Sequence, residues 1–224
     1  MNSLWIFGCS FSSGYLNVGV NNSYGNLIGK EIGCSVNNLS RPGSSNDMIY
    51  YDLLRNVQHI KENDYIIFQF SSFDRIGHFH TDDPNSYFST AGMVHLGIDT
   101  KINEYPFSEY DKDELETLLK YVIYWLPKRS KFDIDNTIST LDLIKTTKNV
   151  KYSLLCVNDG GYEFNDRIVK LPTEENKENV SMYDFVVKEK LTLSDEFPED
   201  FDYYDTHPGV IGHQRIKDHI MNQF

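Results

Sequence analysis

Two short segments near opposite ends of the chain carry the residue types of a nucleophilic hydrolase. The first, Leu4–Gly14 (L-W-I-F-G-C-S-F-S-S-G), is an apolar run that leads into a turn at Ser10. The second, D-T-H-P-G-V-I-G-H, contains Asp205 and His207 two residues apart. A serine hydroxyl becomes a useful nucleophile when an imidazole takes its proton and a carboxylate orients that imidazole. The two segments therefore predict acyl transfer through a Ser-His-Asp triad, provided that the fold brings them together.

Neighbouring residues are alternatives for the same roles. Ser12 and Ser13 are rival nucleophiles, although they lie farther from the end of the predicted strand. Cys9 is a weaker rival, because its side chain should alternate toward the interior. Asp202 is an alternative to Asp205 as the acid of the triad. For His213 we expect a role in helix packing rather than in catalysis.

Apolar strands alternate with amphipathic helices along the chain, which predicts the elements that position these residues. Strands are expected at Leu4–Gly8, Cys34–Leu39, Asp64–Phe70 and Lys151–Val157, and helices at Tyr24–Ile32, Ser45–Ile60, Asp111–Trp125, Asp135–Lys148, Ser181–Lys190 and Pro208–Asn222. Ser23 is the expected N-cap of the first helix. Strands separated by helices imply βαβ units and a parallel sheet with helices on both faces. We predict a three-layer α/β/α sandwich of the flavodoxin-like type with a short parallel sheet.

The length of 224 residues predicts a single domain, residues 1–224. Two stretches without a sustained period, about 77–110 and 158–204, are interpreted as insertions. The acidic residues of the second stretch indicate a solvated face rather than a site. The first stretch has the residue types of a metal site but not the helical spacing, so we expect a polar loop and no metal. Those residues are His78, His80, Asp82, Asp83 and His95.

The net charge of −12 disfavours nucleic-acid backbones and anionic membranes as partners. No apolar run approaches the roughly 18 residues of a membrane span. The N-terminus has no recognisable signal peptide, so we expect a cytoplasmic protein, with a phage virion as an alternative location. Cys9, Cys34 and Cys156 lack metal-ligand spacing and are expected to be reduced core residues. The oligomeric state stays open.

Several polar residues follow predicted strands and should meet at one edge of the sheet. Ser10 follows the first strand, Gly43 the second, and the segment Ser71–Arg75 the third. In open parallel sheets, ligands bind beyond the carboxyl ends of the strands, where the strand order reverses. The loop before the C-terminal helix can reach the same edge.

These segments resemble the sequence blocks of the SGNH hydrolases, the GDSL-type esterases and lipases, and particularly their divergent phage-type members. G-C-S at 8–10 resembles the G-D-S block, N-L-S-R-P-G-S-S-N resembles the second block, and D-T-H-P resembles the last block, D-x-x-H. The resemblance implies the SGNH hydrolase fold and no cofactor. It also implies that Ser10 is the nucleophile, His207 the general base and Asp205 its orienting acid. The backbone N–H groups of Ser10 and Gly43 would line the oxyanion hole.

The third block departs from the family pattern, because Q-F-S-S-F-D-R contains no asparagine in the expected place. Loss of one oxyanion-hole donor can lower a rate on the order of 100- to 1000-fold. A replacement donor would come from Ser72 or Asn46, or else from Ser71 or Arg75. Ser71, Asp74 and Arg75 are also expected to contact the substrate.

Two functions from different classes follow from these residues. The first is a serine esterase that cleaves a short-chain ester, such as an acetyl group on a carbohydrate, on a small-molecule or glycan substrate. The second is an SGNH-like binding or structural module, for example of a phage particle, with little or no activity. A hydrogen bond between Ser10 and His207 would favour the enzyme, and a filled site would favour the module.

Overall fold

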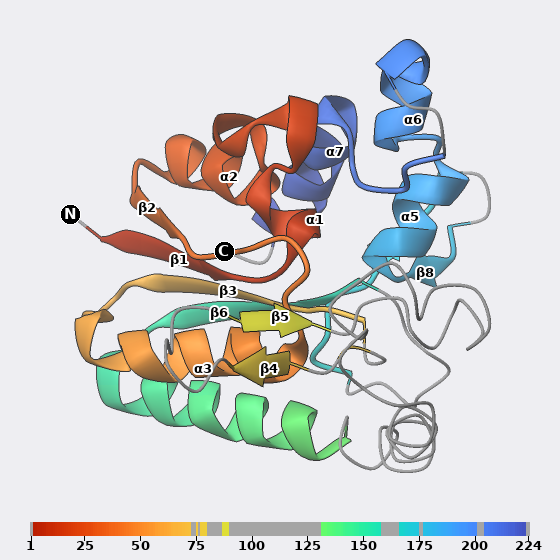
Figure 1. Ribbon diagram of the computed structural model, residues 1–224. Coiled ribbons are helices and arrows are strands. Elements are labelled where there is room, and N and C mark those ends of the chain that lie inside the picture. The colour runs from red at the N-terminus through yellow and green to blue at the C-terminus, as the bar shows by residue number, and fades with distance from the viewer. Residues whose placement is uncertain are drawn as a thin grey trace, which may run out of the picture.

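The computed structural model describes residues 2–72, 75, 77–79, 87–89, 131–157, 166–174, 177–200 and 204–222. Within them, a parallel sheet of four strands is flanked by helices (Figure 1). The predicted helix Asp111–Trp125 and most of the stretch 77–110 lie outside the described residues.

The sheet consists of β1 (Ser3–Phe7), β2 (Ser35–Asn38), β3 (Tyr65–Phe70) and β6 (Lys151–Cys156). All its pairs are parallel, and the spatial order is β2-β1-β3-β6. Each strand begins and ends within one residue of its predicted bounds. The order matches the first four strands of a flavodoxin-like sheet, so the predicted α/β fold is confirmed.

The two central strands are almost continuously buried, because helices cover both faces of the sheet. Every residue of β1 and β3 after the first is buried, whereas the edge strand β2 is half-buried to exposed. This difference follows the apolar runs W-I-F and I-I-F, which are typical of strands buried on both faces. The more polar sequence S-V-N-N of β2 is consistent with its position as an edge strand, which solvent reaches.

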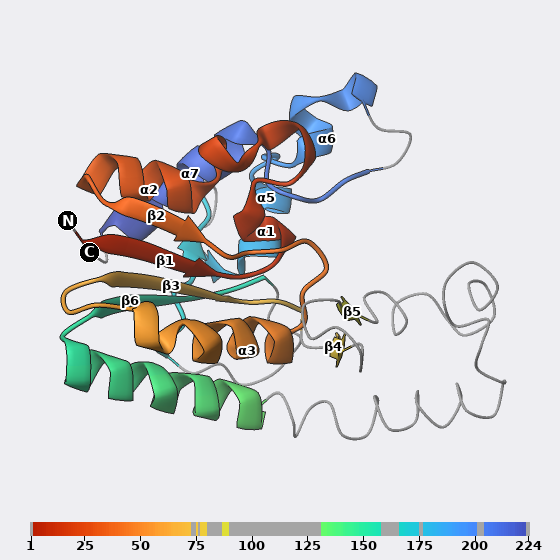
Figure 2. The ribbon, with the colours of Figure 1, turned by 60° about the vertical axis from the view of Figure 1, so that its left-hand side comes forward.

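The helices form the two outer layers of the fold. α1 (Ser10–Ser13), α2 (Tyr24–Ile32) and α7 (Val210–Met221) cover one face, and α3 (Asn46–Asn56) and the helical residues 131–148 cover the other (Figures 1 and 2). The views agree that α7 lies beside α2, so the C-terminal helix packs next to an N-terminal one. The first and last parts of the chain therefore lie close together.

Glycines allow α2 to approach the sheet closely. A Cβ on Gly25 would lie 2.1 Å from Cδ1 of Ile6, and one on Gly29 would lie 2.1 Å from Cγ2 of Val36. Because neither distance permits a real side chain, both positions require glycine at this helix–sheet spacing. α2 has the bounds predicted for it, although Ser23 at its N-cap donates to Oδ1 of Asn26 instead of accepting a backbone N–H.

The remaining elements are short. The predicted helix Ser45–Ile60 is α3 followed by a 3₁₀ turn, and the helix predicted at Ser181–Lys190 is confirmed as α5. The antiparallel pairs are β4 (Gly77–Phe79) with β5 (Tyr87–Ser89) and β7 (Leu171–Pro172) with β8 (Asn179–Val180). The short helices are α5 (Met182–Lys188) and α6 (Leu193–Glu196), and the 3₁₀ turns are Leu16–Val18, Val20–Asn22, Val57–His59 and Pro198–Asp200.

A buried carboxylate ties the strands together at the amino end of the sheet. Asp64, just before β3, is 2% exposed. Its Oδ1 accepts the N–H of Ser3 at 2.8 Å, and its Oδ2 accepts Nε1–H of Trp5 and the N–H of Lys61, both at 2.9 Å. Three donors thus compensate the desolvation of one charge and fix β1 against β3.

Candidate active site

Ser10 lies at the first position of the four-residue helix α1, directly after β1 and the turn Gly8-Cys9. Cys9 is extended at the N-cap, and Gly14 ends the helix in the left-handed region with φ 73°. The strand–turn–helix arrangement places Ser10 at the carboxyl end of a central strand, where Ser10 is 3% exposed. A backbone N–H at the start of a helix has no partner within the helix, which suits binding of negative charge.

The structure brings Ser10, His207 and Asp205 into a single hydrogen-bonded chain. The Oγ of Ser10 lies 2.7 Å from Nε2 of His207. Nδ1 of His207 lies 2.7 Å from Oδ1 of Asp205, which also accepts the backbone N–H of His207 at 2.8 Å. Asp205 is 4% exposed and the His207 side chain is 23% exposed. The imidazole thus has one nitrogen on a buried carboxylate and the other on a serine hydroxyl.

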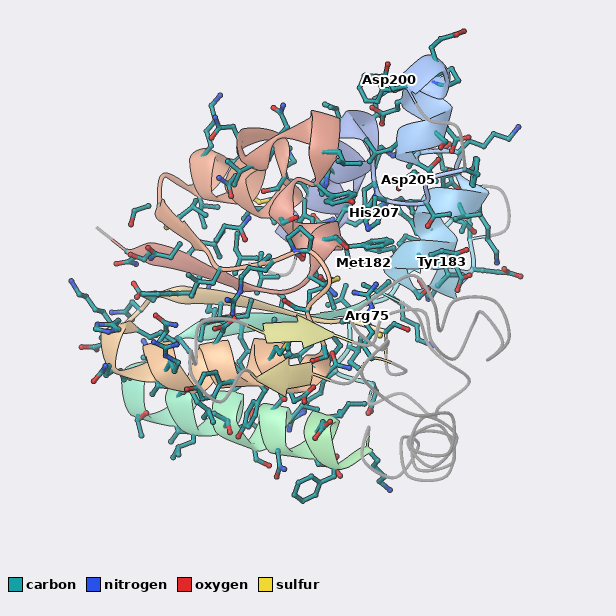
Figure 3. All side chains as sticks on the ribbon, in the orientation of Figure 1. Arg75, Met182, Tyr183, Asp200, Asp205 and His207 are labelled. Carbon is teal, nitrogen blue, oxygen red and sulfur yellow. The ribbon has the colours of Figure 1, made fainter. Side chains whose placement is uncertain are left out.

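The loop that carries Asp205 and His207 is fixed by hydrogen bonds to α6 and to Leu191, just before α6. The N–H of Leu193 donates to the carbonyl of His207 at 2.7 Å, and the N–H of Asp205 donates to Oγ of Ser194 at 2.6 Å. The N–H of Gly209 donates to the carbonyl of Leu191 at 2.9 Å. Figure 3 shows Asp205 and His207 pointing from this loop toward the carboxyl end of the sheet.

The C-terminal helix begins later than predicted because an acidic side chain caps it. Both carboxylate oxygens of Glu196 accept helix N–H groups: Val210 and Ile211 donate at 2.7 Å and Gly212 at 3.2 Å. The predicted start at Pro208 is wrong, since Pro208 pairs in a bridge with Thr192. A carboxylate stabilises the positive end of a helix. In this part of 158–204 an acidic residue is thus structural, which differs from the interpretation as a solvated face.

The environment of His207 favours a neutral imidazole. Burial lowers the pKa of His207, and the hydrogen bond and charge of Asp205 oppose this shift without cancelling it. The positive charge of Arg75 lowers the pKa further. The rings of Phe11 and Tyr15 lie over the imidazole, with centroid distances of 5.1 and 4.5 Å. At neutral pH the imidazole can therefore accept a proton.

Gln69, a residue that sequence reasoning missed, fixes the turn before the nucleophile. This fully buried amide on β3 accepts the N–H of Cys9 at 3.0 Å and the Oγ–H of Ser12 at 2.8 Å, and donates to the carbonyl of Phe70. The hydroxyl of Tyr24, whose pKa burial raises, lies 2.5 Å from the same Ser12 oxygen. The sequence feature that could have indicated a role for Gln69 is its position as the one polar residue within the apolar run I-I-F-Q-F.

The rival nucleophiles are placed differently from Ser10. The Ser12 hydroxyl is fully buried in the Gln69 network, and Oγ of Ser13 donates to the carbonyl of Ser10 at 3.1 Å. The thiol of Cys9 belongs to the hydrophobic core and is 1% exposed. Among the described residues, the hydroxyl that contacts His207 is that of Ser10, and Asp202 lies outside these residues.

The residues expected to complete the oxyanion hole lie on two neighbouring segments. Gly43 adopts φ 79° in the turn before α3. Oδ1 of Asn46 accepts the N–H of Ser71 at 2.7 Å, and its Nδ2 faces the carbonyl of Ser71 at 3.4 Å. The Asn46 amide thus joins the N-terminus of α3 to the end of β3. Ser72 is half-buried beside this contact.

The third strand also delivers a charged residue to the site. Nη1 of Arg75 donates to Oγ of the buried Ser71 at 3.0 Å. Figure 3 shows Arg75 and His207 at the same end of the sheet, with Met182 between them in this view. Asp74, the other expected substrate contact, lies outside the described residues.

His213 has the packing role that we expected. It is fully buried on α7, its Nδ1 accepts the N–H of Tyr24 at 3.1 Å, and its ring stacks on that of Tyr24 at 5.8 Å. Burial lowers the pKa of His213 to about 3, so the ring is neutral. It stabilises the contact between α7 and α2.

Other features of the described residues lie apart from the triad. A cavity of about 970 Å³ between residues 38–41 and 52–59 contains no triad residue, and its Arg41 is paired with Asp52. Within the described ranges, no three His, Cys, Asp or Glu residues gather as metal ligands. The side chains of the histidine- and aspartate-rich segment 78–95 lie outside those ranges. No helix in the described part of the chain combines the length and hydropathy needed to cross a membrane. All three cysteines are free thiols.

Comparison with known proteins gives structural neighbours only. No protein-family model and no curated protein matches the sequence. The chain is similar to solved structures of lipases and esterases, one of them from the G-D-S-L lipolytic family. Those neighbours include a lipase/acylhydrolase from Enterococcus faecalis (13% identity, 99% of this chain and 94% of that chain, TM-score 0.39). They also include a lipolytic G-D-S-L family protein from Veillonella parvula (12% identity, 100% of this chain and 98% of that chain, TM-score 0.38). A third is a psychrotrophic esterase from Pseudoalteromonas (12% identity, 100% of this chain and 96% of that chain, TM-score 0.38). At these identities and TM-scores the similarity carries no argument about activity.

Proposed function

We propose that this chain is a divergent SGNH-type serine hydrolase that cleaves a short-chain ester. The observation that carries the proposal is the chain of two 2.7 Å contacts from Ser10 through His207 to Asp205. Such a chain is the arrangement by which a weak hydroxyl becomes a nucleophile. The same contact favours the enzyme over a binding module that has lost catalysis.

The proton follows the hydrogen bonds during acylation. Nε2 of His207 takes the proton of the Ser10 hydroxyl as Oγ attacks the ester carbonyl, while Nδ1–H keeps donating its hydrogen bond to Asp205. The resulting imidazolium gives the proton to the departing alkoxide, which leaves as an alcohol. Water then attacks the acyl-enzyme with His207 as base, and the acid and free Ser10 are released.

Backbone N–H groups of Ser10 and Gly43 stabilise the oxyanion of the tetrahedral intermediate in this proposal. The position of Ser10 at a helix start and the left-handed turn at Gly43 support these two donors. Asn46 and Ser72 are the further candidates. The amide of Asn46 already binds the backbone of Ser71, which supports Asn46 as a residue that positions the site.

A small acyl group such as acetyl, carried on a small molecule or a glycan, is the proposed substrate. The half-buried ring of Tyr15 beside His207 offers the flat apolar contact that sugars and small esters use. We further propose that residues 1–224 act as a single SGNH-hydrolase-like domain without a cofactor.

Hydrolysis of p-nitrophenyl acetate, butyrate and octanoate by the wild type, Ser10→Ala and Ser13→Ala tests the proposal. We expect Ser10→Ala to lower kcat/KM by about 10⁴-fold, because the nucleophile is removed. Ser13→Ala is the control, since it removes a neighbouring hydroxyl that lacks the imidazole contact. Activity that survives in Ser10→Ala, with the protein folded, would reject Ser10 as the nucleophile.

A further inference from the structure

Among the described arginines, Arg75 is the one whose side chain binds a neutral hydroxyl and neither a carboxylate nor an aromatic ring. The guanidinium is half-buried at the end of β3, and its hydrogen bond at 3.0 Å goes to the neutral hydroxyl of Ser71. No carboxylate among the described residues pairs with it. The other four have a carboxylate or ring partner: Arg41 with Asp52, Arg167 with Asp142, Arg215 with Glu174, and Arg55 over the ring of Tyr51.

The positive charge of Arg75 acts on the imidazole of His207. It lowers the pKa of His207 in the same direction as burial does, although burial is the larger cause. During Ser10 attack His207 becomes an imidazolium, so two positive charges then lie in the same partly buried site, where solvent screens them weakly. A negative group bound to Arg75 would remove this repulsion.

Ser71 orients the guanidinium of Arg75 and, among the described residues, occupies one of its N–H donors. Arginine has five N–H donors in a planar fork, and one of them is directed at Oγ of Ser71. Ser71 itself is fixed, because its backbone N–H binds Asn46 and it is fully buried. A fork held in this way matches the two oxygens of a carboxylate.

We propose that Arg75 binds a carboxylate on the ester substrate, which makes the enzyme selective for anionic esters. This inference rests on the proposed function and names its substrate class. The net charge of −12 repels anions at long range, so the selectivity must come from the local contact with Arg75. Arg75 is thus a specificity-determining residue in the same site as the triad.

Two pairs of matched esters test the proposal and show which side of the ester carries the charge. 4-Acetoxybenzoate and 4-acetoxybenzamide differ in charge on the alcohol side, and mono-p-nitrophenyl glutarate and p-nitrophenyl butyrate differ on the acyl side. kcat/KM is measured for all four with the wild type, Arg75→Met, Arg75→Lys and the control Arg55→Met. The control removes the same charge from the exposed surface of α3.

In at least one pair, Arg75→Met should lower kcat/KM for the anionic ester by about 10- to 100-fold, the range for a charged hydrogen bond. The neutral ester of that pair should change by less than about threefold. Arg75→Lys should recover part of the loss, because it keeps the charge without the fork. Arg55→Met should change neither ester.

If Arg75→Met lowered kcat/KM equally for the charged and the neutral esters, the proposal would be overturned. Arg75 would then be assigned to stabilising the oxyanion of the tetrahedral intermediate instead. No loss on any ester would also overturn the proposal. In both cases hydrolysis that still requires Ser10 would leave the proposed function standing, whereas hydrolysis independent of Ser10 would remove that function first.

A pH profile separates charge recognition from a merely structural role. With the neutral ester, Arg75→Met should raise the pH at which kcat/KM reaches half its plateau, because a cation near His207 is gone. The other groups that face His207 are Asp205, Ser10 and the Phe11 and Tyr15 rings, and His213 interacts with it from α7. None of them is altered in this variant. An unchanged midpoint would contradict the electrostatic contact.

Discussion

The two ends of the parallel sheet place polar groups in opposite ways. At the amino end, both oxygens of buried Asp64 accept three N–H groups from β1 and the turn before β3. At the carboxyl end, the Ser10 hydroxyl binds the imidazole of His207, and Arg75 binds the neutral hydroxyl of Ser71. The first arrangement stabilises the fold, and the second holds the groups that exchange a proton or bind the substrate in the proposed cycle. A buried charge is therefore no sign of catalysis unless some of its neighbours remain available.

The buried carboxylates of Asp64 and Asp205, one at each end of the sheet, also differ in what they bind. Asp64 binds only donors that stay in place, whereas Asp205 binds the imidazole of His207, which gains and loses a proton in the proposed cycle. Substitutions at the carboxyl end should therefore affect rate, and substitutions at the amino end should affect stability.

The largest effect is expected for His207→Ala. Removal of the base leaves Ser10 with an unactivated hydroxyl, so kcat/KM for p-nitrophenyl acetate should fall by about 10⁴-fold or more. The unfolding midpoint in urea, measured on the same preparation, checks that the variant is folded. A comparable rate in a folded His207→Ala protein would contradict the triad.

Asp205→Asn should give the next largest effect. The amide places an N–H₂ group or a weaker acceptor against Nδ1 of His207, which disfavours the productive tautomer. We expect kcat to fall on the order of 10³-fold, with KM within a few-fold of wild type. Steady-state kinetics measures both values, and a loss confined to KM would assign Asp205 to binding.

Asp64→Asn should lower the stability of the protein and leave its catalytic rate nearly unchanged. One carboxylate oxygen becomes an N–H₂ group that faces the donors of Trp5, Lys61 or Ser3, so the free energy of unfolding should fall by about 1–3 kcal/mol. kcat of the folded protein should remain within about twofold. Urea denaturation and ester hydrolysis on the same preparation test the contrast, and a large loss of kcat without loss of stability would refute it.

The protonation of His213 should have no effect at neutral pH and should become visible only as the pH falls. Its folded pKa of about 3 lies below the ordinary value of 6.5, so the unfolded chain takes up a proton first. Stability should therefore decline below about pH 6 by up to about 1.4 kcal/mol per pH unit from this residue. His213→Asn, which keeps an acceptor for the N–H of Tyr24, should flatten this decline. Parallel declines in both proteins would show that His213 is not the cause.

The bounds of the helices and strands could be predicted from the sequence more completely than the contacts between them. The bounds of α2 and of the four strands follow from local apolar periodicity, which is why prediction recovered them. The start of α7 at Val210 could not be recovered, because its cap is Glu196, fourteen residues earlier in the chain. Local sequence favoured Pro208 as a first helical residue, and a long-range carboxylate overrode it.

The candidate site shows the same limit. Residues at strand ends could be assigned to one edge of the sheet, because parallel strands share that edge. The Gln69 network and the contact of the Arg75 guanidinium with Ser71 depend on side-chain directions that no spacing rule predicts. Asp202, Asp74 and the histidines of the segment 78–95 remain predictions, because their side chains lie outside the described residues.

Covalent labelling with diethyl p-nitrophenyl phosphate tests the central claim most directly. The reagent phosphorylates an activated serine and then resists hydrolysis, so mass spectrometry of the digested protein can identify the modified residue. The account predicts one diethylphosphoryl group on Ser10 in the wild type and none in Ser10→Ala or His207→Ala. A label on Ser12, Ser13 or Cys9, or a label on Ser10 that does not require His207, would contradict it.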